Sequence, residues 1–260
     1  MTSSRDLLIV AEDLARAAGD MALRGRKSGD VAATTKSSPT DMVTQYDKAS
    51  EELITSGLAS RRPHDGIIGE EGASVSGSSG ITWHIDPIDG TSNFYFDIPM
   101  WAVSIGAVDE NGPLVGVVYA PALGEMYTAI RGEGAFLNGS PIHVRDNSEL
   151  SDALVCTGFS YRVHERTQHA QRVAQMVTHI RDIRRFGAAA IDLCFVACGR
   201  YDAYFEEHLH SWDLVAGQVI ATEAGAIVTN YAGESVTPAQ VLAAQPGIQQ
   251  QLIQLIAQSS

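Results

Sequence analysis

Apolar residues recur with helical spacing in several parts of the chain and so predict amphipathic helices. The first predicted helix covers residues 4–25, where Leu7, Ala11 and Leu14 fall on one face. The second follows Thr44, a residue suited to capping a helix, and places Asp47 in its first turn. The helices expected from this spacing lie at 4–25, 45–60, 164–180, 187–198, 212–224 and 247–257.

Short runs of alternating or continuous apolar residues predict strands between these helices. The expected strands lie at 67–68, 81–85, 101–108, 113–120, 125–130, 153–159, 201–206, 227–229 and 240–243. Turn sequences at Asn111-Gly112, Leu123-Gly124 and Asn138-Gly139 separate the central strands, which predicts an antiparallel meander. Residues 26–40 are expected to form a loop or loose hairpin, and the Ser- and Gly-rich tract 73–80 a mobile connection.

Composition narrows the class of protein. A chain of 260 residues is long enough for a substantial core, as one large domain (1–260) or two closely packed halves that divide near residue 145. The formal net charge of −13 argues against nucleic acid or an anionic membrane surface as the main partner. Residues 1–6 lack the features of a signal peptide, and no apolar run approaches the ~20 residues of a membrane helix. We therefore expect a cytoplasmic protein without a membrane partner.

The cysteines and two of the histidines suggest no separate site. Cys156, Cys194 and Cys198 form an odd set without a secretory signal, which predicts reduced thiols. Cys194 and Cys198 share a helix face, where buried thiols are favoured over a soft-metal pair. His208 and His210 have the spacing of a zinc pair, but no further residues with zinc spacing accompany them.

The richest chemistry follows the apolar run 81–85, in the sequence Asp86-Pro87-Ile88-Asp89-Gly90-Thr91. Pro87 restricts its own φ and favours an extended conformation at Asp86, while Gly90 allows a sharp turn and a close approach. The segment can therefore hold two carboxylates near one point, with free backbone N–H groups directly after them.

The segment is best interpreted as a site that binds a metal ion and a phosphate group. The two acids of a glycosidase must approach a sugar from opposite faces, which two aspartates on one short segment do poorly. Mg²⁺ binds clustered carboxylates, backbone carbonyls and substrate phosphate oxygens. The N–H groups after Gly90 could hold that phosphate. An Asp-Pro turn with a helix cap is the simpler alternative.

The same segment resembles the first signature of the inositol monophosphatase family, D-P-[ILV]-D-G-T-x-N-[FY]. Three further motifs of that family occur in the family's order, from residue 36 to residue 225. They are Lys36-Ser37-Ser38-Pro39-Thr40-Asp41 followed by Val43-Thr44 and Asp47, then Gly69-Glu70-Glu71, then Trp212-Asp213-Leu214-Val215-Ala216-Gly217 running to Glu223-Ala224-Gly225.

The resemblance implies an α+β fold, the layered α/β/α/β/α sandwich of the Mg²⁺-dependent, lithium-sensitive phosphatases, assembled as a homodimer. It places most metal ligands in residues 1–145. Residues 146–260 would carry Asp213 and the groups that bind substrate.

The resemblance also implies two or three Mg²⁺ ions per subunit. Glu70, Asp86 and the carbonyl of Ile88 would bind the first, and Asp86, Asp89 and Asp213 the second, with Glu70 and waters reaching a third. Electrostatics agrees with this grouping, because two carboxylates 4 Å apart repel by about 4 kcal/mol at an effective dielectric of 20. Bound cations would also let an acidic protein attract a phosphate.

Catalytic roles are implied for Asp47, Thr91 and Glu70. The Thr91 hydroxyl and Asp47 match the family's pair that orients the attacking, metal-activated water. Backbone N–H groups at Gly90 and Thr91 would hold phosphate oxygens. Lys36 would lie in a flap over the site.

Substrate recognition is expected mainly in the second half. Glu206 matches the glutamate that accepts hydrogen bonds from inositol hydroxyls, and the backbone of Gly187 and Ala189 would face the ring. Ser160 is a weaker candidate at the rim. The full set implied to contact substrate is Asp89, Gly90, Thr91, Ser160, Gly187, Ala189, Glu206 and Asp213.

The predicted function is hydrolysis of a small phosphorylated polyol, with inositol monophosphate as the first choice. The alternatives are histidinol phosphate, fructose 1,6-bisphosphate and 3′-phosphoadenosine 5′-phosphate. The sequence departs from the family pattern at Ala188 and Ala226, and Ala188 removes a possible hydroxyl near the substrate. A regulatory binding protein is an alternative from another class, supported by the arginines at 162, 166, 172, 181, 184 and 185.

Overall fold

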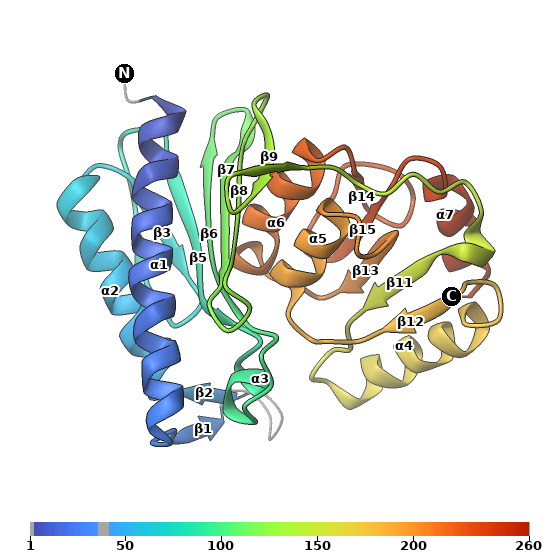
Figure 1. Cartoon of the computed structure of the whole chain (residues 1–260), viewed down its shortest axis with the longest axis horizontal. Coiled ribbons are helices and arrows are strands. Elements are labelled where there is room, and N and C mark those ends of the chain that lie inside the picture. The colour runs from blue at the N-terminus through green and yellow to red at the C-terminus, as the bar shows by residue number, and fades with distance from the viewer. Residues whose placement is uncertain (1–2, 36–41, 260) are drawn as a thin grey trace.

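The computed structural model describes residues 3–35 and 42–259 and arranges them in five layers (Figure 1). Two helices, α1 (Ser4–Ser28) and α2 (Gln45–Arg61), cover the outer face of a first sheet. A middle layer of α5 (Ala189–Ala197) and α6 (Ser211–Glu223) separates this sheet from a second one. Two further helices, α4 (Val163–Met176) and α7 (Gln249–Gln258), cover the far side. The predicted α/β/α/β/α sandwich is confirmed.

The first sheet has eight strands in the order β10-β9-β8-β7-β6-β5-β3-β4. Its strands are β3 (Gly66–Gly69), β4 (Ser74–Val75), β5 (Thr82–Asp89), β6 (Ala102–Asp109), β7 (Gly112–Ala120), β8 (Glu125–Ile130), β9 (Gly134–Leu137) and β10 (Ser140–Ile142). Strands β5 to β10 pair with their neighbours in antiparallel order. The turn sequences predicted this for the central strands β6, β7 and β8, whereas β9 and β10 were not predicted. Only the pairing of β3 with β5 is parallel among the described strands of this sheet.

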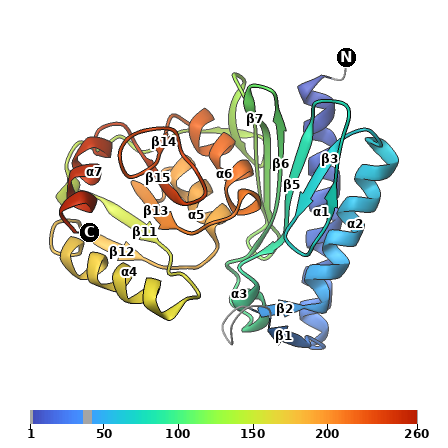
Figure 2. The same ribbon diagram turned by 180° about the vertical axis from the view of Figure 1, so that it is seen from behind.

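The second sheet has five strands in the order β12-β11-β13-β15-β14. They are β11 (Leu154–Thr157), β12 (Asp182–Arg184), β13 (Ala203–Glu207), β14 (Ile227–Thr229) and β15 (Gln240–Ala244). Strands β12, β11 and β13 run parallel, whereas β15 pairs antiparallel with β13 and β14. Seen from behind, the two sheets lie on opposite sides of α5 and α6 (Figure 2).

The middle layer explains why α5 and α6 are so apolar. All nine residues of α5 are buried, because both of its sides face a sheet. Helix α6 packs closely on β6 and β7 at two glycines. A Cβ atom added to Gly106 would lie 2.9 Å from the Ala216 backbone nitrogen, and one added to Gly116 would overlap the Ala216 carbonyl. The sheet can therefore hold the start of α6 close to the end of β5.

Helix termini follow the capping signals in the sequence. The side chain of Ser3 caps α1 in a reciprocal arrangement with Asp6, and Gly29 ends that helix in the left-handed region. Thr44 caps α2 together with Asp47, as predicted for this residue. Two short strands, β1 (Ala33–Thr35) and β2 (Met42–Thr44), form an antiparallel hairpin before α2. Lys36, predicted to lie in a flap, falls outside the described residues.

Three predicted segments differ from the structure. The tract 73–80 is not wholly a connection, because Ser74–Val75 forms β4 on the edge of the first sheet. Helix α4 ends at Met176 rather than near 180, and the chain then forms β12, a strand that the polar sequence did not predict. Strand β11 ends at Thr157, two residues before the predicted end, so that 158–162 is free to form a loop.

Within the described part of the chain, each helix is too short or too polar to span a bilayer.

Candidate active site

A single cavity of about 580 Å³ lies where the ends of β5 and β13 meet the starts of α5 and α6. Its wall contains eleven of the predicted site residues, Asp213 among them. They are Glu70, Asp86, Ile88, Asp89, Gly90, Thr91, Ser160, Gly187, Ala189, Glu206 and Asp213. The cavity therefore brings together residues from both halves of the chain.

The end of β5 places the two aspartates of the first motif at the inner end of the cavity. The strand continues through this motif to Asp89, with an irregularity in its pairing between Asp86 and Asp89. The Ser50 hydroxyl donates a hydrogen bond to the Pro87 carbonyl at 3.1 Å, which ties this irregular segment to α2. Both carboxylates are buried, and the motif forms the end of a strand.

Asp213 approaches the same point from the first turn of α6. It accepts a hydrogen bond from the His210 N–H at 2.6 Å, which fixes the carboxylate at the helix start. Ligand oxygens of Asp86, Asp89 and Asp213 all lie within 4.8 Å of one another. Glu70, at the end of β3, lines the same cavity and raises the pKa of Asp86 through its charge.

Burial and mutual repulsion shift the pKa of each of these aspartates upward. Burial raises the pKa of Asp86 and Asp89 well above the usual value, and neighbouring carboxylates raise both further. Burial likewise raises the pKa of Asp213 to about 7. A cluster of hard oxygen donors that carries excess negative charge fits a divalent cation such as Mg²⁺. Glu70, Asp86, the Ile88 carbonyl, Asp89 and Asp213 are the groups available to hold it.

The start of α5 also contributes to this cluster. The backbone N–H groups of Ala189 and Ala190 donate to Asp89 at 3.1 and 2.8 Å. A carboxylate is stabilised at a helix N-terminus, where free N–H groups carry partial positive charge. Ala189 was predicted to face the substrate with its backbone, but its N–H group is used by Asp89.

Thr91 and Asp47 lie in contact beside the aspartates. The Thr91 hydroxyl lies 2.9 Å from Asp47 Oδ1 and 3.1 Å from the Ile88 carbonyl. Asp47 also accepts a hydrogen bond from the Thr44 N–H at 2.8 Å. Burial raises the pKa of Asp47 to about 6, although its hydrogen bonds with Thr44 and Thr91 oppose the shift. Gly90 precedes the short helix α3 (Thr91–Tyr95) with a φ of 89°, a conformation that suits glycine.

Glu51 is a buried residue of α2 that the sequence did not single out. Its two carboxylate oxygens accept hydrogen bonds from the N–H groups of Glu71 and Ala73, at 2.8 and 2.9 Å. These bonds hold the turn that follows Glu70. Glu51 lies one helical turn after Asp47, and this spacing could have indicated that its side chain points the same way. Its hydrogen-bond partner, however, is 20 residues away in the sequence and cannot be predicted from helical spacing.

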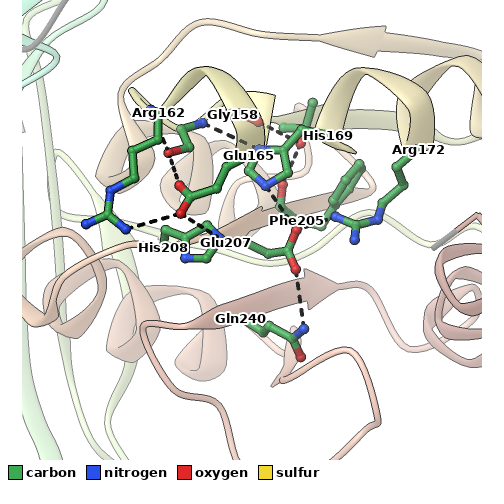
Figure 3. A network of polar contacts seen from close by, with 11 residues as sticks. Gly158, Arg162, Glu165, His169, Arg172, Phe205, Glu207, His208 and Gln240 are labelled. Carbon is green, nitrogen blue, oxygen red and sulfur yellow. Dashed lines mark hydrogen bonds and ion pairs between the residues drawn. The ribbon is translucent and has the colours of Figure 1, made fainter. Parts of the chain in front are cut away.

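The predicted substrate residues Ser160 and Glu206 also line the cavity. A polar network, shown in Figure 3, lies beside them. Glu206 accepts a hydrogen bond from the Tyr204 hydroxyl at 2.7 Å. Next to it, Glu207 accepts from Arg172, from His169 at 3.1 Å and from Gln240 at 3.3 Å, which fastens α4 to the end of β13. The Ser160 hydroxyl donates to Glu165, so this predicted rim residue is already paired.

The arginines of 162–185 do not form a free basic surface. Arg172 is buried against Glu207, while the other paired members bind exposed or half-buried carboxylates. These pairs are Arg162 with Glu165, Arg181 with Asp152 and Arg184 with Asp182. Arg185 turns to the cavity instead and lines its wall.

Comparison with known proteins agrees with this geometry. Residues 3–260 match the model of the "Inositol monophosphatase family". The chain belongs to the inositol monophosphatase family. Family membership makes it a phosphoric monoester hydrolase.

The proteins that are similar to this chain carry two kinds of name. "Inositol-1-monophosphatase SuhB" of Mycobacterium tuberculosis is 43% identical over 266 residues, covering 94% of this chain and 91% of the relative. "Nus factor SuhB" of Pasteurella multocida is 38% identical over 255 residues, covering 96% and 95%. The crystal structure of extragenic suppressor protein suhB from Bartonella henselae has a TM-score of 0.93 at 31% identity, covering 98% of this chain and 100% of that one.

The raised pKa values predict how stability depends on pH. Asp47, Asp86, Asp89 and Asp213 bind protons more tightly in the folded chain than in the unfolded chain, where the pKa of Asp is close to 3.8. In EDTA, the free energy of unfolding should therefore fall as the pH rises from 5 to 8, by up to about 1.4 kcal/mol per pH unit for each extra proton bound. Mg²⁺ should raise the melting temperature more at pH 8 than at pH 5. Equal melting temperatures in EDTA at the two pH values would contradict this assignment.

A second prediction concerns Glu51. In Glu51→Gln an amide NH₂ would face one of the two backbone N–H donors, so the variant should lose about 1–3 kcal/mol of unfolding free energy. The turn after Glu70 should also loosen, so that half-maximal activity needs several-fold more Mg²⁺. Glu52→Gln, an exposed change of the same charge on the same helix, is the control and should change stability by less than about 0.5 kcal/mol. Urea unfolding and Mg²⁺ titration of activity test both variants, and identical behaviour of the two would disprove the role.

Proposed function

We propose that the chain hydrolyses a small phosphorylated polyol, with inositol monophosphate as its substrate, in a reaction that requires Mg²⁺. One observation carries this proposal: the acidic cluster and Glu206 line the same cavity. Family membership supports phosphate ester hydrolysis, and the cavity supports a substrate that extends from the acidic cluster toward Glu206.

In this proposal Glu70, Asp86, the Ile88 carbonyl, Asp89 and Asp213 hold two or three Mg²⁺ ions. Bound there, Mg²⁺ would act as a Lewis acid on the phosphoryl oxygens and lower the pKa of a water. The five protein groups fix where the phosphate can lie, since each comes from a strand end or a helix start.

Thr91 and Asp47 orient the attacking water. The Thr91 oxygen accepts a hydrogen bond from the water while the hydroxyl proton is donated to Asp47. Asp47 is mostly ionised at pH 7, because its pKa is about 6. In this proposal the N–H groups of Gly90 and Thr91, at the start of α3, donate to phosphate oxygens.

Glu206 binds hydroxyl groups of the polyol in this proposal. Burial raises the pKa of Glu206, and the Tyr204 hydroxyl and the charge of Arg185 oppose that shift. The ionised carboxylate accepts hydrogen bonds from the hydroxyl groups of a polyol. An ester without hydroxyl groups cannot make these bonds. Lithium inhibition and a homodimer complete the proposal, both on the likeness to the family alone, and a cytoplasmic location stays a prediction from the sequence.

The regulatory alternative draws its support from the names of relatives, such as the "Nus factor SuhB" of Pasteurella multocida. The arginines on which it depended are largely paired with carboxylates of the same chain. The enzymatic proposal therefore remains the one that the geometry supports.

Phosphate release from a panel of esters tests the proposal directly. The panel contains inositol 1-phosphate, histidinol phosphate, fructose 1,6-bisphosphate, 3′-phosphoadenosine 5′-phosphate and p-nitrophenyl phosphate, each with Mg²⁺ and with excess EDTA. We expect the highest kcat/KM for inositol 1-phosphate and no turnover in EDTA. Activity that survives chelation would refute the metal-dependent mechanism.

Asp89→Asn tests the acidic cluster. The amide oxygen still accepts one hydrogen bond from the start of α5, but the amide NH₂ would face the second N–H donor, so the variant should fold with some loss of stability. It also removes one negative charge from the cluster. Turnover should fall at least about 100-fold even in saturating Mg²⁺, a loss of roughly 2.7 kcal/mol in transition-state stabilisation. Near wild-type turnover would show that Asp89 is not a metal ligand.

Glu206→Gln separates substrate recognition from chemistry. The variant retains an acceptor for Tyr204 but loses the charge, so kcat/KM for inositol 1-phosphate should fall by about 1.5–3 kcal/mol, roughly 10- to 150-fold. Hydrolysis of p-nitrophenyl phosphate, which has no hydroxyl groups, should change far less. Equal losses on both esters would assign Glu206 to the fold or the metal site.

A further inference from the structure

Arg185 occupies the wall of the cavity next to the predicted substrate residues. It lies between β12 and α5, and its side chain is exposed to the solvent of the cavity. The guanidinium covers Gly187, because a Cβ atom added there would overlap Arg185 Nη1. Its central carbon also lies 5.9 Å from the centroid of the Phe159 ring. These two contacts place the guanidinium beside Gly187 and Phe159 in the cavity wall.

The charge of Arg185 acts on Glu206. Burial raises the pKa of Glu206, and the positive charge of Arg185 is among the causes that lower it. The other arginine of the cavity wall, Arg162, is instead paired with Glu165 at 3.3 Å. Within residues 3–35 and 42–259, Arg185 has no carboxylate at hydrogen-bonding distance, so its N–H donors are available to a ligand.

Together, Arg185 and Glu206 present opposite charges and complementary hydrogen-bonding groups. A guanidinium offers up to five N–H donors, and a carboxylate offers only acceptors. A hydroxyl group both donates and accepts, so neighbouring hydroxyls on one ring can satisfy the two residues together. An ammonium group would be attracted by Glu206 but repelled by Arg185, and a second phosphate would be attracted by Arg185 but repelled by Glu206. Neither charged group can therefore satisfy both residues, whereas a pair of hydroxyl groups can.

We infer that Arg185 is a specificity-determining residue that binds hydroxyl oxygens of the substrate, so that the part of the cavity lined by Arg185 and Glu206 selects a neutral polyhydroxyl group. The inference rests on the proposed function, because it names the chemistry of the part of the substrate that carries no phosphate. It separates the polyol substrate from its rivals: histidinol phosphate carries an ammonium group, and fructose 1,6-bisphosphate a second phosphate.

Arg185→Gln tests this assignment in the full-length protein. We expect kcat/KM for inositol 1-phosphate to fall about 10- to 100-fold, the effect of losing hydrogen bonds from a charged group. The value for p-nitrophenyl phosphate should change less than about threefold, and the ratio of histidinol phosphate to inositol 1-phosphate turnover should rise. Arg185→Lys keeps the charge without the forked donors. It should continue to exclude histidinol phosphate but should not restore use of inositol 1-phosphate.

Arg181→Gln is the matched control. Arg181 is paired with Asp152 on the surface, so this variant removes the same charge without touching the cavity. Its kinetics should match wild type within about twofold, because exposed charges are screened over a distance of ~10 Å at ordinary salt. The melting temperature of each variant shows whether it is folded.

The possible results distinguish this inference from the proposed function. If Arg185→Gln loses activity equally on inositol 1-phosphate and p-nitrophenyl phosphate, the inference is overturned. It is also overturned if the variant uses inositol 1-phosphate as well as wild type does. In either case, turnover of inositol 1-phosphate by the wild-type protein would leave the proposed function intact. Wild-type protein that hydrolyses p-nitrophenyl phosphate but not inositol 1-phosphate would overturn both the polyol substrate and the role of Arg185.

Discussion

Repulsion between buried carboxylates is the constraint on which the site depends. Asp86, Asp89 and Asp213 offer oxygens within 4.8 Å of one another, and the burial of Asp86 and Asp89 leaves little water to screen the charges. Backbone N–H groups offset part of the repulsion between these carboxylates. The start of α5 donates to Asp89, and the N–H of His210 donates to Asp213. The remaining negative charge is what a divalent cation would neutralise.

The five-layer arrangement follows from where those N–H groups must lie. Helices α5 and α6 begin at the acidic cluster and then run between the two sheets, so both helices must be apolar on every side that meets a sheet. Gly106 and Gly116 let α6 come close enough to the first sheet to bring Asp213 beside β5. The two halves of the chain are thus joined by the same elements that position the carboxylates.

Local signals made much of this predictable from the sequence. The layered fold and the family followed from four motifs, and most helices followed from the spacing of apolar residues. Positions that depend on distant partners were missed or misread. Glu51 meets its partners across 20 or more residues, and Arg172 is buried against Glu207, 35 residues away, instead of facing a partner protein. Strand β12 is short and polar, and only its pairing with β11 makes it a strand.

Asp47 has two structural tasks that cannot be separated. The same carboxylate closes the first turn of α2 with Thr44 and accepts the hydrogen bond of Thr91 in the cavity. A replacement that disturbs either contact would disturb the other, so a second substitution nearby could not easily compensate for it. We therefore expect few tolerated replacements at this position in a mutational scan. Selection on folding and selection on turnover would be indistinguishable there.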